Sequence, residues 1–104
     1  MSNKAKKIIE IEINGVKYPY LETCGSLLDF KQETGLDSPV DLEDNIKYIY
    51  FVVRSACRRS GKTFEMSFQE FADSLDLEEF TRLMQEIAAR AADGSGEEGP
   101  GKNV

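Results

Sequence analysis

Residues 8–20, which read IIEIEINGVKYPY, constrain the fold more than any other part of the chain. Apolar and acidic side chains alternate over 8–13, which predicts a strand with one buried and one wet face. Asn14-Gly15 follows, and this dipeptide favours a type I′ turn because both central positions need positive φ. The returning strand is 16–20, where Pro19 must lie at an edge or near the strand end. A lone hairpin is barely stable in water, so helices or a second copy must cover its isoleucine face.

Two helices are predicted directly after the hairpin. The first runs over 26–34 and ends on Gly35, which is expected in a left-handed conformation. The second runs over 42–59 with Asp41 as its N-cap. Its apolar side chains cover most of its circumference, and such a helix is either buried in a core or covered by a partner. The sequence leaves both possibilities open.

Two further helices open on capping motifs. Ser67 and Glu70 form an S-x-x-E box before a short third helix, and Asp76 and Glu79 repeat the device before a last helix over 77–92. The order of these elements predicts an α+β domain, in which an N-terminal hairpin packs against about four helices.

The chain of 104 residues is expected to hold one domain, at 8–92. Its polar, basic segment 1–7 and its glycine-rich segment 93–104 are expected to be disordered. Segment 1–7 has no apolar stretch typical of a signal peptide. The longest apolar run, 48–53, is far below the roughly 20 residues of a membrane span.

The composition argues against several chemistries. With 19 acidic and 13 basic residues the net charge is −6, which disfavours nucleic-acid binding. The chain has no histidine, so a zinc site and a Cys-His or Ser-His nucleophile pair are not expected. Cys24 and Cys57 are predicted to be free, partly buried thiols. We expect no enzyme, metal or cofactor.

Residues 56–63, ACRRSGKT, match a relaxed phosphate-loop pattern. A phosphate loop lies between a strand and a following helix, whereas here a helix precedes the glycine and an extended piece follows. The segment is therefore interpreted as the basic C-terminal end of a helix.

Two segments carry a resemblance to a known family. The first is YPYLETCGSLLDFKQETG at 18–35, and the second is the S-x-E-E-F-A-D-x-L-D-like piece at 67–76. In order and spacing they resemble the small tail assembly chaperones of long-tailed bacteriophages and prophages. The resemblance covers roughly 8–90, and it departs from the family at Glu22 and Cys24, where basic and larger apolar residues are more common.

The resemblance implies a non-enzymatic protein of the bacterial host cytoplasm. Such chaperones bind and solubilise the tape measure protein, promote tail tube assembly around it, and are absent from the finished virion. The expected recognition is helix-in-groove, with part of the apolar surface of 42–57 and 77–91 exposed in the free protein. The predicted partner-binding residues are Tyr48, Phe51, Val52, Phe80, Leu83, Met84 and Ile87.

The family also often makes a longer product by ribosomal frameshifting, which recruits the tail tube protein, and the glycine-rich tail would suit a linker there. A monomer or weak oligomer is expected. The alternatives are a small structural protein of a mobile element, such as a head-tail joining ring assembled through the hairpin edge, or a regulatory one. An acidic mimic of nucleic acid is a third, weaker hypothesis, because the charges are spread along caps and loops.

Overall fold

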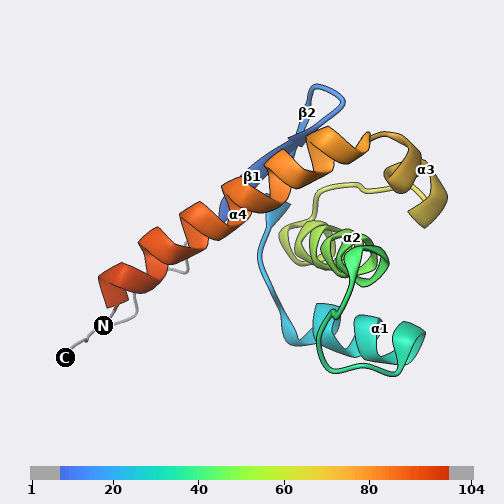
Figure 1. Cartoon of the computed structure of the whole chain (residues 1–104), viewed down its shortest axis with the longest axis horizontal. Helices are drawn as coiled ribbons and strands as arrows, with labels where there is room; N and C mark the ends of the chain where they lie inside the picture. Colours follow the sequence, from blue (N-terminus) through green and yellow to red (C-terminus); the bar gives the residue numbers. More distant parts are fainter. Residues whose placement is uncertain (1–7, 99–104) are drawn as a thin grey trace.

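The computed structural model describes residues 8–98, with side chains described as far as residue 90 (Figure 1). It is an α+β fold in which an antiparallel two-stranded hairpin is followed by four helices. The elements are β1 (Ile9–Ile13), β2 (Val16–Tyr20), α1 (Cys24–Thr34), α2 (Leu42–Ser60), α3 (Phe68–Asp73) and α4 (Leu77–Glu98).

The hairpin has the predicted turn and register. Asn14 and Gly15 have φ values of 54° and 80°, as a type I′ turn requires, and Ile13 pairs with Val16 beside the turn. Ile11 and Ile13 are buried, so the alternation of the first strand does place its isoleucine face inward.

Neither outer edge of the hairpin is free along its whole length to pair with another strand. Pro19 pairs with Glu10, and because proline cannot donate to a ladder its position must be a non-hydrogen-bonded pair. The Glu10 carbonyl then points away from β2, and Arg90 Nη1 of α4 donates to it at 3.2 Å. One edge therefore carries a proline, and the other is partly covered by α4.

Helix α2 is the centre of the molecule. It contacts α1, β2 and α3, and Figure 1 shows it almost end-on with α1 below it and α3 and α4 above. Its apolar circumference is thus explained by burial against its own chain. The buried apolar residues of this helix are Ile49, Tyr50, Phe51, Val52, Val53, Ala56 and Cys57.

Most helix ends follow the predicted signals. Gly35 and Gly61 end α1 and α2 with φ values of 78° and 79°, and Asp41 caps α2 by accepting from the Asp44 amide. Helix α1 begins at Cys24, two residues before the predicted start, because Thr23 forms a capping box with Ser26. The sequence analysis missed this box because serine stands where glutamate or glutamine is usual.

Helix α4 continues to Glu98, whereas the sequence predicted an end near residue 92 followed by disorder. The prediction was based on the composition of 93–104, which holds four glycines, a proline and no aromatic residue. Two of these glycines, Gly94 and Gly96, lie within α4, where each costs a helix about 1 kcal/mol relative to alanine. In Figure 1 the last turns of α4 extend past the hairpin. The predicted disorder of 1–7 and of 99–104 lies outside the described residues. None of the described helices is both long and apolar enough to cross a membrane.

Candidate partner-binding surface

The structure places four of the seven predicted partner-binding residues in the core. Phe51, Val52, Phe80 and Leu83 are only 8%, 0%, 3% and 5% exposed. The expectation that they offer an exposed apolar surface is wrong for this conformation, because α1, α3 and the hairpin cover the helix faces that carry them. A residue buried to this extent contacts a partner only after the domain opens.

The other three predicted residues, Tyr48, Met84 and Ile87, are half-buried at the margin of the core. Tyr48 is held by its own chain: its ring packs edge-on against Phe30 with centroids 5.4 Å apart, and its hydroxyl donates to Glu22 at 2.6 Å. This contact ties α2 to the segment before α1, so a structural role accounts for Tyr48.

An apolar notch lies where α2, α3 and the start of α4 meet. Its volume is about 190 Å³, below the roughly 300 Å³ from which pockets for small molecules begin, so it suits one large side chain of a partner. Leu77 lies at its rim and is 65% exposed, which leaves a large apolar side chain in solvent. The notch is lined by Ile46, Phe71, Ala72, Leu75, Asp76, Leu77 and Phe80.

The turn between α3 and α4 fixes the geometry of this notch. Asp76 and Glu79 form the predicted box: the Glu79 amide donates to Asp76 Oδ1 at 2.7 Å, and the Asp76 amide donates to Glu79 Oε1 at 3.0 Å. Ser67 and Glu70 hold the start of α3 in the same way. The sequence alone does not show that Leu77 lies at the rim of this notch, because that position depends on how α2, α3 and the start of α4 meet.

A second, larger hollow of about 580 Å³ lies between β1 and α4. Charged side chains of both signs dominate its walls, so it does not suit an apolar segment. The charged residues that line it are Glu10, Glu12, Lys17, Glu79, Arg82, Glu86 and Arg90.

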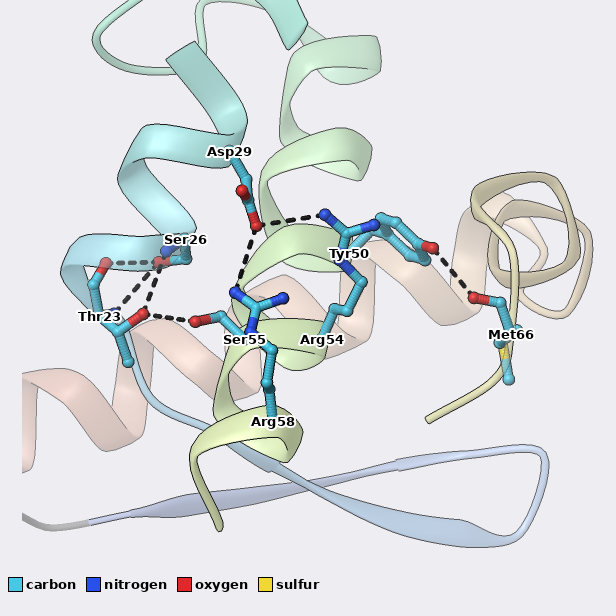
Figure 2. Close-up of polar contacts among 8 residues, drawn as sticks. All are labelled: Thr23, Ser26, Asp29, Tyr50, Arg54, Ser55, Arg58 and Met66. Carbon is cyan, nitrogen blue, oxygen red and sulfur yellow. Dashed lines mark hydrogen bonds and ion pairs between the residues drawn. The ribbon is translucent and has the colours of Figure 1, made fainter. Parts of the chain in front are cut away.

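A polar network joins α1 to α2 (Figure 2). The Asp29 carboxylate accepts a hydrogen bond from Arg54 Nη2 at 3.2 Å and lies 3.6 Å from Arg58 Nη2. The hydroxyls of Thr23 and Ser55 are 2.6 Å apart. These contacts orient α1, whose sequence contains few apolar residues to hold it by packing alone.

We expect the free energy of unfolding to fall at alkaline pH, because two phenols, those of Tyr20 and Tyr48, have shifted pKa values in the folded protein. Burial, with the nearby Glu22 carboxylate as a second cause, raises the pKa of both above the ordinary value. Folding therefore favours the neutral phenols: their contribution is complete below about pH 10, the pKa expected in the unfolded chain, and is lost as the pH rises towards the folded pKa. In urea titrations, the Tyr48→Phe variant should show a smaller fall in the free energy of unfolding between about pH 8 and pH 11 than the wild type. An equal fall in both proteins would show that Tyr48 does not contribute.

The cysteines are both free, as predicted. Cys57 is fully buried and burial raises the pKa of its thiol, which makes it unreactive. Cys24 is exposed at the first turn of α1, in contrast to the predicted partial burial. Among the side chains that the structure describes, no three of the His, Cys, Asp or Glu type converge in a way that would hold a metal ion.

Comparisons with family models, with curated proteins and with solved structures find no match to this chain.

Proposed function

We propose that this protein is a tail assembly chaperone of a long-tailed bacteriophage or prophage, acting without catalysis in the cytoplasm of the bacterial host. The order of the motifs at 18–35 and 67–76 supports the family. The observation that carries a binding function is the apolar notch, with Leu77 exposed at its rim. Single exposed apolar side chains are common on proteins, and Leu77 is distinguished by lying beside an apolar hollow that a side chain of another protein can fill.

In this proposal, a helix of the tape measure protein inserts one large apolar side chain into the notch and covers Leu77. The bound helix lies across the notch where α2, α3 and the start of α4 meet, in a helix-in-groove mode of peptide recognition. Coverage of apolar stripes keeps the tape measure soluble until tail tube subunits assemble around it. The chaperone is then released, so it is absent from the finished virion, and a longer frameshifted product brings the tail tube protein.

The small volume of the notch implies that a single contact is weak. Burying one large apolar side chain contributes about 1.5–3 kcal/mol, which is far from the roughly 8 kcal/mol of micromolar binding. A long tape measure helix that offers many such side chains would bind many copies of the chaperone, and weak contacts between neighbouring copies on that helix would raise the overall affinity. A monomer or weak oligomer suits this mode of action.

The Leu77→Lys variant should lose capture of the tape measure protein, because it places a charge at the rim of the notch. Leu77 is 65% exposed, so the change should alter the free energy of unfolding by no more than about 0.5 kcal/mol. The matched control is Leu28→Lys on α1, where the leucine is 66% exposed. The measurement is the amount of tape measure protein that remains soluble and co-purifies with each tagged variant.

The Leu28→Lys control also shows where the tape measure protein binds if the contact site is not the apolar notch. Loss of capture by Leu28→Lys, with Leu77→Lys unaffected, would move the contact site to the exposed leucines of α1. Capture by both variants at the wild-type level would exclude both surfaces.

The alternative function, a ring-forming structural protein, requires a free strand edge for assembly between copies. Pro19 on one edge of the hairpin and the Arg90 contact on the other both oppose such pairing. The chaperone is therefore the function that the surface supports best.

A further inference from the structure

A cleft of about 400 Å³ lies at the C-terminal end of α2, and three cationic side chains line it. They are Arg54, Arg58 and Lys62, and Phe64 completes the wall. We call this the basic cleft. It shares no lining residue with the apolar notch and plays no part in the proposed contact there.

The end of α2 brings the cleft together. Arg54 and Arg58 lie one helical turn apart, and Gly61 then reverses the chain in a left-handed conformation. The Lys62 amide donates to the Cys57 carbonyl at 2.9 Å, which fixes the chain as it leaves the helix towards Phe64.

Aromatic rings hold two of the three cations. The Arg54 guanidinium lies 5.0 Å from the centroid of the Phe51 ring and 5.5 Å from that of Tyr50. Lys62 Nζ lies 5.8 Å from the centroid of Tyr18. Such contacts order long side chains in advance, and a site that is ordered before binding loses less entropy when a ligand arrives.

The charge of the cleft is unusual in this protein. The stretch 54–62 contains four basic and no acidic residues, in a chain whose net charge is −6. Asp29 pairs with Arg54 and Arg58, whereas Lys62 has no ion-pair partner among the side chains that the structure describes. The helix dipole favours cations in the last turn of α2, but it does not account for Arg54, which lies further back, or for Lys62 beyond the cap.

Asp29 shows how a carboxylate binds here. Its Oδ2 atom lies between the Nη2 atoms of Arg54 and Arg58, as Figure 2 shows. Arg58 is 56% exposed, so part of its guanidinium remains open to a second anion on the side that faces the cleft. Guanidinium groups match the planar geometry of carboxylates, and each bond to an ionised group is stronger than a neutral one.

We propose that the basic cleft binds a glutamate or aspartate side chain from an acidic segment of a partner protein. The carboxylate contacts Arg58 and Lys62, and the neighbouring apolar part of the segment packs on Phe64. A nucleic acid is disfavoured because its affinity depends on neutralising many phosphates, and two of the three cations here, Arg54 and Arg58, are already partly neutralised by Asp29.

The test is fluorescence anisotropy of a fluorescein-labelled oligoglutamate peptide titrated with the full-length protein at low salt. The Arg58→Gln/Lys62→Gln double variant should weaken binding by about tenfold or more, because two charge-assisted contacts are lost. The matched control, Lys31→Gln/Lys47→Gln, removes two cations from other surfaces and has the same net charge. It should stay within about twofold of the wild type, since neither lysine lines the basic cleft.

Three outcomes would overturn the site. They are an absence of saturable binding by the wild type, an equal loss in the two double variants, and preferential binding of an oligothymidylate probe over oligoglutamate. If the Arg58→Gln/Lys62→Gln variant melts at a lower temperature than the wild type, the Lys62→Gln single variant replaces it in the peptide titration. Lys62 forms no ion pair among the described side chains, so its replacement should not affect folding. That single variant should still bind more weakly than the control. The peptide measurement does not involve the tape measure protein, so its outcome is separate from that of the proposed function.

Discussion

Replacement of Tyr50 by alanine is expected to lower the free energy of unfolding by about 3–5 kcal/mol, the cost of a large aromatic truncation in a core. Tyr50 is 5% exposed and lies at the middle of an aromatic cluster. The neighbouring rings have centroids 5.4–5.8 Å from its own, and they belong to Phe51, Phe64, Phe68 and Phe71. Since a domain of this size has about 5–15 kcal/mol of stability in total, the variant should be close to unfolding.

The Tyr50→Phe variant is the matched control for this experiment. It keeps the ring and removes the hydroxyl, which donates to the Met66 carbonyl at 2.9 Å. Loss of that bond should cost about 1 kcal/mol, and urea unfolding followed by circular dichroism measures both variants. A cost below about 1 kcal/mol for Tyr50→Ala would contradict the assignment of the aromatic cluster to the core.

The Phe80→Ala variant should be destabilised by about 3 kcal/mol or more, and its loss of tape measure binding should follow from unfolding. The sequence analysis placed Phe80 in a partner-binding surface, whereas the structure buries it to 3% exposure below the apolar notch. Its removal enlarges the notch and also removes packing that joins α4 to the core.

The comparison variant for Phe80→Ala is Leu77→Ala, three residues earlier on the same helix. Leu77 is exposed, so this variant should keep its stability within about 0.5 kcal/mol while the rim of the notch loses apolar surface. A Phe80→Ala protein with wild-type stability and reduced binding would show that Phe80 contacts the partner directly, as the sequence analysis predicted, and would contradict its assignment to the core.

Local signals in the sequence predicted the local structure well. Asn14-Gly15, Gly35 and the boxes at 67–70 and 76–79 each act through backbone geometry within a few residues, so the sequence alone determines them. The hairpin, the four helices and the α+β class follow from such signals together with apolar periodicity.

The candidate site was harder to predict because it depends on which helix faces meet. Periodicity showed that α2 is apolar almost all round, but it could not distinguish a helix enclosed by its own chain from one covered by a partner. The pairing of Asp29 with Arg54 and Arg58 joins two helices, and no local motif encodes it. The basic cleft was not predicted for the same reason: it depends on tertiary packing, and the sequence analysis interpreted 58–62 only as a helix end.

The measurement that tests the central claim most directly is co-expression of this protein with the tape measure protein of the same genetic element, followed by affinity capture and native mass analysis. The chaperone function predicts that the tape measure becomes soluble only in the presence of this protein and is captured with many copies bound to each tape measure chain. If both proteins are expressed and soluble and no complex is captured, the chaperone function is contradicted.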